Sequence, residues 1–177
     1  MERALAGLPL LEGKTIRVAF RKSLFTRRGR LHAQPPGDEV HAASFLRRRR
    51  IYLEEALLGD PSELRRILIH ELFHFVWMRL GNEERQQWER LLVQEFRGGA
   101  GGELGYSAAW RKQALAPSAP GSRSRLWREY VCESFCDSAA WWFLCPAEHE
   151  EFTLGKRWRA RRGRWLAAFM DRAPLPV

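Results

Sequence analysis

The sequence predicts an α+β fold that is mostly helical, with a small antiparallel or mixed sheet near the N-terminus. Hydrophobic residues make up 45% of the 177 residues and eight residues are tryptophan, a composition typical of a globular chain with a core. Alternating strand patterns fall within residues 14–58, and apolar residues at helical spacing dominate the remainder. The length fits a single domain, residues 1–177.

Two stretches carry the predicted strands. KTIRVAF (residues 14–20) alternates polar and apolar residues, as a half-buried strand does. RRIYLEEALL, which begins at Arg49 and ends at Leu58, can form a second strand, although its last residues also suit a helix. Between them, residues 21–40 contain a Pro-Pro-Gly break and predict a loop or hairpin.

A long helix is predicted over residues 61–80. Asp60 can cap its first turn, Pro61 suits the first helical position, and Glu63 follows the cap by three residues. Gly81 marks its end. Four further helices are predicted, over residues 82–96, 106–115, 125–144 and 152–171. The glycine-rich segment 98–105 is expected to be a mobile loop, and residues 116–124 are expected to be a linker.

The first long helix contains the apolar stretch ILIHELFHFVW, with three titratable residues in its middle. His70 and His74 stand four residues apart, so both project from one face of the helix and can reach one metal ion. Glu71 is rotated about 100° around the helix, where it can activate a water molecule on the metal. Burying such groups without partners costs several kcal/mol, so H-E-x-x-H here predicts a Zn²⁺ site, one ion per chain.

A catalytic zinc site needs a third protein ligand. The metzincin pattern is excluded because Trp77 and Leu80 occupy its glycine and histidine positions. LWREYVCESFCDSAAWW, on the later helix over residues 125–144, offers Glu133 as the ligand and Asp137 to accept the free ring N–H of a ligand histidine. Two alternatives for the third ligand stay open, Cys136 on the same helix and His149 beyond it.

HELFH followed by ESFCD on a later helix resembles the gluzincin metallopeptidases, of which thermolysin is an example. EYVCESFCDSAAWW is also similar to the Glu helix of compact, lethal-factor-type members. The resemblance implies a zincin-like fold with an active-site helix, a Glu helix and an upstream sheet whose edge strand holds extended substrate. His70, His74 and Glu133 would bind zinc, Glu71 would be the general base and Asp137 would hold a ligand.

The same resemblance implies two further assignments. The strand within residues 49–58 falls where the edge strand belongs, so a peptide or protein substrate would pair with it. The lethal-factor-type domains use a tyrosine to stabilise the oxyanion at the position held here by Leu126. Tyr130, or Tyr106 beside the glycine-rich segment, is the substitute candidate.

The predicted function is zinc-dependent hydrolysis of peptide bonds, with Glu71 moving the proton of the attacking water. The alternative is a non-catalytic or latent zinc-stabilised module that binds protein or nucleic acid through its basic surface. The net charge of +9 is compatible with nucleic-acid binding. However, the basic helix predicted over residues 152–171 has Trp158, Arg162, Trp165 and Phe169 at helical spacing, which favours a packing face over a nucleic-acid-binding surface. Manganese, cobalt or iron would fit the same ligands.

A cytoplasmic protein without a membrane segment is expected. No stretch approaches the roughly 18 apolar residues of a membrane span, and the N-terminus lacks a clear signal peptide. The cysteines number three, which does not suit a disulfide framework, and Cys132, Cys136 and Cys145 lie in mostly apolar sequence. They are expected to be reduced, buried thiols.

Overall fold

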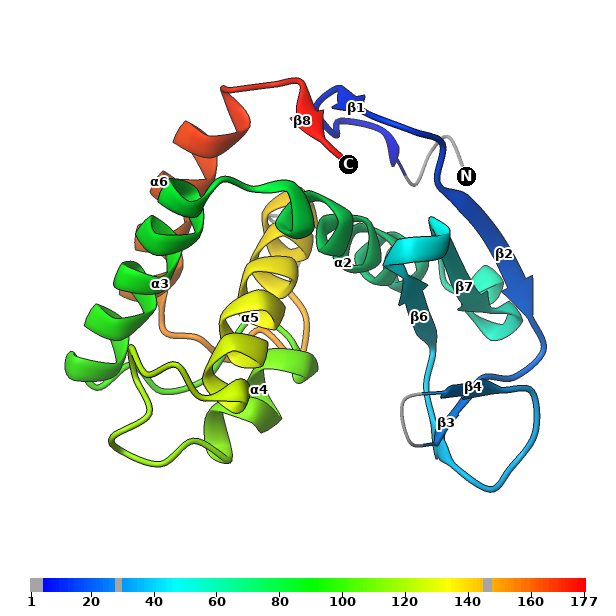
Figure 1. Cartoon of the computed structure of the whole chain (residues 1–177), viewed down its shortest axis with the longest axis horizontal. Helices are drawn as coiled ribbons and strands as arrows, with labels where there is room; N and C mark the ends of the chain where they lie inside the picture. Colours follow the sequence, from blue (N-terminus) through cyan, green and yellow to red (C-terminus); the bar gives the residue numbers. More distant parts are fainter. Residues whose placement is uncertain (1–4, 28–29, 145–147) are drawn as a thin grey trace.

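One long helix, α2 (Pro61–Arg79), lies between a three-stranded sheet and the other helices (Figure 1). The computed structural model describes residues 5–27, 30–144 and 148–177, and the predicted α+β class is confirmed. The other helices are α3 (Asn82–Arg97), α4 (Tyr106–Gln113), α5 (Arg125–Leu144) and α6 (Lys156–Met170). The strands are β1 (Leu11–Glu12), β2 (Arg17–Arg21), β3 (Phe25–Arg27), β4 (Arg30–His32), β5 (Asp38–Glu39), β6 (Ala42–Phe45), β7 (Arg50–Glu54) and β8 (Leu175–Pro176).

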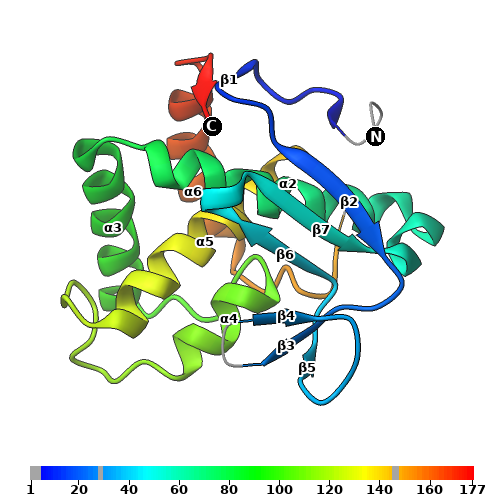
Figure 2. The same ribbon diagram turned by 45° about the vertical axis from the view of Figure 1, so that its right-hand side comes forward.

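The sheet that covers α2 has the strand order β2-β7-β6 (Figure 2). β2 runs parallel to β7, and β6 runs antiparallel to it. The edge-strand prediction for residues 49–58 was therefore wrong, because β7 is the central strand and a 3₁₀ turn follows it at Glu55–Gly59. Ile51 and Leu53 on β7 are fully buried, as expected for a central strand, and the edge strand beside α2 is β6.

The predicted start of α2 is confirmed. Asp60 Oδ1 accepts hydrogen bonds from the backbone N–H groups of Ser62 and Glu63, both at 3.0 Å, and Pro61 occupies the first turn, where its missing N–H costs nothing. α5 has the predicted bounds, and α2 packs more extensively against α5 than against any other element. The two helices that carry the predicted ligands are thus direct neighbours.

Aromatic side chains fill the space between the helices. The Phe135 ring on α5 lies 5.8 Å from that of Phe73 on α2, 5.9 Å from Trp88 on α3 and 5.8 Å from Phe169 on α6, measured between ring centroids. The predicted packing face of the basic helix is confirmed. Trp165 and Phe169 pack against this core with their rings stacked, and Trp158 packs in a second buried cluster with Trp141 and Leu154. Within the described ranges, no helix combines the length and apolar character needed to cross a membrane.

The glycine-rich segment, residues 98–105, has no regular structure but packs into the protein, which corrects its prediction as a mobile loop. Ala100, Glu103 and Leu104 are buried. Gly102 has φ +73°, and a Cβ there would lie 2.4 Å from the carbonyl oxygen of Thr153. Glycine here permits a left-handed backbone conformation and a close approach rather than motion.

A buried ion-pair cluster fixes this segment to the helices. Arg162 on α6 contacts Glu95 on α3 and Glu103 in the segment, each at 2.7 Å, and all three side chains are fully buried. Lys112 on α4 lies 3.0 Å from Glu103, and the Tyr130 hydroxyl donates to Glu103 Oε1 at 2.5 Å. These buried contacts therefore link α3, α4, α5 and α6 to one another.

This cluster makes folding stability sensitive to acid. Burial raises the pKa of Glu103, but Arg162, followed by Lys112, outweighs burial and leaves that pKa below its ordinary value. The stabilisation is fully present above the unfolded-state pKa of about 4.3 and is lost as the pH falls through the folded-state pKa. We expect Glu103→Gln to flatten the dependence of the unfolding free energy on pH below about 4.3, measured by urea unfolding.

Glu129→Gln is the matched control for this measurement, because Glu129 lies in a surface pair with Arg125. Its pH dependence should match that of the wild type. An equal acid dependence in wild type and Glu103→Gln would contradict the assignment of acid sensitivity to Glu103.

Candidate metal centre

The predicted ligands on α2 face α5 across a small pocket. His70 and His74 lie one helical turn apart with ring centroids separated by 4.9 Å, and Glu133 approaches from α5. The pocket has a volume of about 280 Å³. It is lined by Ser44, Leu46, His70, Glu71, His74, Ser107 and Glu133.

Three donor atoms converge in this pocket. His70 Nε2 lies 3.1 Å from His74 Nε2 and 3.3 Å from Glu133 Oε2, and His74 Nε2 lies 3.7 Å from Glu133 Oε2. Ligands bound tetrahedrally at about 2.0–2.1 Å are separated by about 3.3–3.4 Å. The triangle thus has the dimensions of three zinc ligands, and these three residues could hold a metal ion.

Asp137 orients the first imidazole, as predicted. Its Oδ1 atom accepts a hydrogen bond from His70 Nδ1 at 2.7 Å, and its Oδ2 atom accepts one from the Ala108 N–H at 2.9 Å. A Cβ at Gly105 would lie 2.3 Å from the Asp137 carboxyl carbon, so only glycine fits there. The bond at Nδ1 leaves the lone pair of His70 Nε2 directed at the pocket.

Replacing Asp137 by asparagine should weaken zinc binding by about 10–100-fold. Asparagine offers one acceptor oxygen where the carboxylate satisfies two donors, the ring of His70 and the N–H of Ala108. Competition with a chromogenic chelator measures the affinity, and circular dichroism checks the fold. Asp171→Asn, at the exposed end of α6, is the control, and equal zinc affinity in both variants would contradict the role of Asp137.

The second imidazole is oriented by sulfur. Nδ1 of His74 lies 3.4 Å from Cys136 Sγ and 3.6 Å from Cys132 Sγ, both on α5. Both cysteines are free, as predicted, but only Cys136 is buried, whereas Cys132 is half-buried and Cys145 lies outside the described residues. His74 therefore directs Nδ1 at the two sulfur atoms and Nε2 at the donor triangle. Cys136 therefore belongs to a separate possible donor group, with Cys132 and Nδ1 of His74.

The other alternative ligand is remote from the pocket. His149 Nε2 lies 3.3 Å from Glu63 Oε2, in the first turn of α2. Glu63 precedes His70 by seven residues, a rise of about 10 Å along the helix. His149 therefore does not reach the donor triangle in this structure.

Charges around the donor triangle favour a cation. Burial lowers the pKa of His70, but Asp137 and Glu133 outweigh it and raise that pKa well above the ordinary value. For His74, burial is likewise outweighed, by Cys132 and Glu133, and the pKa rises to about 9. The imidazoles and Arg111 outweigh burial of Glu133 and lower its pKa to about 2. Protons and metal ions would compete for the same nitrogen lone pairs.

Two residues at the site were not identified from the sequence. Arg111 on α4 places Nη2 3.3 Å from Glu133 Oε1, while the other oxygen of Glu133 faces the imidazoles. Ser44 on β6 places its hydroxyl within hydrogen-bonding distance of the Glu71 carboxylate and 3.2 Å from the Glu71 carbonyl oxygen. Both come from elements distant in sequence, and neither has a local motif that could have indicated its role.

The structure contradicts Tyr130 as the candidate for stabilising the oxyanion. Its hydroxyl lies in the buried cluster and donates to Glu103, and its side chain is fully buried. Burial, followed by the charge of Glu103, raises the pKa of Tyr130 well above its ordinary value, so the phenol stays neutral. Tyr106 is exposed at the start of α4, next to Ser107 in the pocket lining, and its role stays a prediction.

Neither a scan against protein-family models nor searches of curated proteins and of solved structures found a match. The resemblance to gluzincins therefore rests on the two motifs and is an expectation.

Proposed function

We propose that this protein is a zinc-dependent peptidase, with His70, His74 and Glu133 as the metal ligands and Glu71 as the general base. The observation that carries this proposal is the donor triangle, with edges of 3.1, 3.3 and 3.7 Å. Two imidazoles and one carboxylate leave a fourth position open, as in catalytic rather than structural zinc sites.

When bound, zinc supplies Lewis acidity, which lets water lose a proton near neutral pH and polarises a carbonyl group. Glu71 lines the same pocket as the three ligands, so its carboxylate can accept the proton of the attacking water and deliver it to the leaving amine nitrogen. Ser44 holds that carboxylate from the edge strand. Arg111 occupies the outer oxygen of Glu133 and leaves the inner one for the metal.

We propose that β6, in place of residues 49–58, is the edge strand that pairs with the peptide substrate. It lies at the edge of the sheet and contributes Ser44 to the pocket lining. A peptide in extended conformation could pair with it by β-augmentation and bring a peptide bond next to Glu71. The proposal includes a cytoplasmic location, with which the free thiols Cys132 and Cys136 agree.

Metal content and peptidase activity test this function together. The purified protein should carry close to one zinc per chain, and Glu133→Ala should lose most of it on dialysis because one of three ligands is removed. Glu129→Ala, one helical turn away and in a surface pair with Arg125, should retain zinc. Peptide hydrolysis, followed by mass spectrometry on a mixed peptide library, should require the metal and stop with a chelator.

Three outcomes would count against the proposal in different ways. Zinc retained in Glu133→Ala would exclude Glu133 as a ligand. Stoichiometric zinc without hydrolysis of any peptide would favour the non-catalytic binding module. No zinc in the wild type after incubation with the metal would remove the metal centre itself.

A further inference from the structure

The edge strand β6 presents unpaired backbone groups beside Glu71. The Glu54 N–H donates to the His41 carbonyl at 2.8 Å, which makes these two residues a hydrogen-bonded pair of the antiparallel ladder. Hydrogen-bonded pairs alternate along such a ladder, so the N–H and C=O groups of Ala42 and Ser44 point away from β7. Within the described part of the chain, no strand pairs with β6 on that side.

A second and larger cleft adjoins the metal pocket across this strand. It has a volume of about 860 Å³ and shares Ser44 and Leu46 with the smaller pocket. Phe45 and Tyr52 lie on the face of the sheet opposite Ser44 and line the larger cleft, with their ring centroids 5.6 Å apart. The remaining lining residues are Arg21, Ser23, Leu24, Leu31, His32, Ala33, Arg47 and Arg48.

The charged residues of this cleft all have the same sign. Three arginines line it, and no aspartate or glutamate is among its lining residues. Arg21 stacks on Tyr52 with its guanidinium carbon 4.9 Å from the ring centroid. A hydrogen bond from Arg50, with smaller contributions from the charges of Arg50 and Arg21, lowers the pKa of Tyr52, which agrees with a positive potential there.

The four arginines of residues 47–50 differ in their contacts. Arg49 and Arg50 have structural partners, since Arg49 donates to the Thr15 carbonyl at 3.3 Å and Arg50 donates to the Tyr52 hydroxyl at 3.4 Å. Arg47 and Arg48 are exposed and have no carboxylate partner among the described residues. Their guanidinium groups are free to bind carboxylates of another molecule.

We propose that the substrate is an extended acidic peptide segment, held by backbone pairing to Ala42 and Ser44 and by Arg47 and Arg48, an inference that rests on the proposed peptidase function. Side chains of a paired strand alternate between the two faces of the sheet. Those on the Ser44 face meet the metal pocket, and the intervening ones meet the arginine-lined cleft. Acidic residues at alternate positions of the peptide are therefore preferred.

The experiment compares two labelled peptides that differ only by glutamate or glutamine at alternate positions. Hydrolysis is measured with the zinc-loaded wild type, and binding with zinc-loaded Glu71→Gln by fluorescence anisotropy. We expect about a tenfold preference for the glutamate peptide in both readouts, the scale of one charge-assisted hydrogen bond. Arg47→Ala/Arg48→Ala should reduce this preference to less than about threefold.

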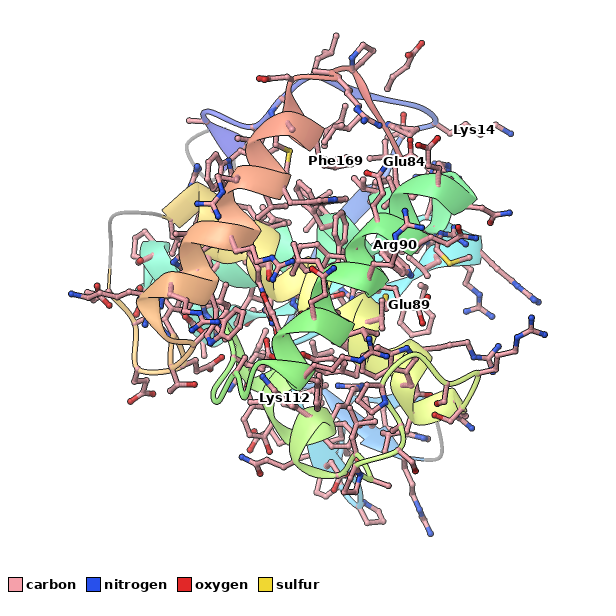
Figure 3. All side chains as sticks on the ribbon, turned by 90° about the vertical axis from the view of Figure 1, so that its left-hand side faces the viewer. Lys14, Glu84, Glu89, Arg90, Lys112 and Phe169 are labelled. Carbon is pink, nitrogen blue, oxygen red and sulfur yellow. The ribbon has the colours of Figure 1, made fainter. Side chains whose placement is uncertain are left out.

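Arg90→Ala/Arg164→Ala is the control, because it removes the same charge from two exposed residues on α3 and α6, away from the cleft. Arg90 lies on the face of the molecule shown in Figure 3. The control should keep the full preference, which would separate a local contact from the effect of the net charge of +9.

The outcomes distinguish this inference from the peptidase function. Hydrolysis without preference would overturn the acidic substrate class and leave the peptidase. A preference that both double variants lose equally would overturn its assignment to Arg47 and Arg48 and leave the peptidase. Binding of the glutamate peptide that depends on Arg47 and Arg48, without hydrolysis, would support the cleft and overturn the peptidase. Neither binding nor hydrolysis would overturn both, and a single-stranded oligonucleotide that binds this cleft in place of the peptide would overturn the acidic-peptide assignment.

Discussion

Replacing Glu71 by glutamine is expected to lower kcat/KM for peptide hydrolysis by about 10²–10⁴-fold while zinc stays bound. The glutamine side chain has nearly the same shape and can still accept a hydrogen bond from Ser44, but it cannot accept and return a proton. Glu71 is not part of the donor triangle, so the substitution leaves the three proposed ligands unchanged. Zinc content and kcat/KM measured on the same preparation test both parts of the prediction.

Glu55→Gln provides the control for this variant, since Glu55 is exposed in the 3₁₀ turn before α2 and does not line the pocket. It should hydrolyse peptides at the wild-type rate. Hydrolysis retained in zinc-loaded Glu71→Gln would exclude Glu71 as the base, and loss of zinc in this variant would show that Glu71 contributes to metal binding instead.

Local sequence patterns were sufficient to predict α2 and α5. Asp60 and Pro61 define the start of α2 through interactions within one turn, so a short stretch of sequence contains all the required information. The four-residue spacing of His70 and His74 fixes their common face for the same reason. Glu133 and Asp137 also stand four residues apart, on α5, and the structure brings both to His70.

Strand order and long-range partners could not be predicted in this way. The apolar sequence of β7 reflects burial, and burial is typical of a central strand as well as of an edge strand covered by a helix. β6 has only four residues, AASF, with no clear alternation. Its position at the edge follows from pairing, which is not encoded in its own pattern.

The position of Tyr130 illustrates a second limit. Tyr130 precedes Glu133 by three residues, so the two residues lie on one side of α5. A tyrosine side chain is long, and its hydroxyl instead reaches Glu103 in the segment 98–105. That contact depends on the buried position of Glu103, which the glycine-rich composition of the segment did not indicate.

Replacing Arg162 by leucine is expected to destabilise the protein by about 3–5 kcal/mol, the cost of removing one partner from a buried ion pair. Leucine would leave Glu95 and Glu103 fully buried without their common cation. The loss is a large part of a total stability of about 5–15 kcal/mol. Urea unfolding measures it, and Arg164→Leu, on the exposed side of the same helix, should stay within about 0.5 kcal/mol of the wild type.

Arg162→Lys keeps this prediction testable if the leucine variant does not fold. Lysine retains the charge but loses the planar guanidinium group that contacts both carboxylates, so an intermediate loss of stability is expected. An unfolding free energy of Arg162→Leu within about 1 kcal/mol of the wild type would contradict a stabilising role for the cluster.

Because Glu103 also contacts Lys112 on α4 and Tyr130 on α5, the Arg162→Lys variant should bind zinc more weakly at the site formed between these helices and α2.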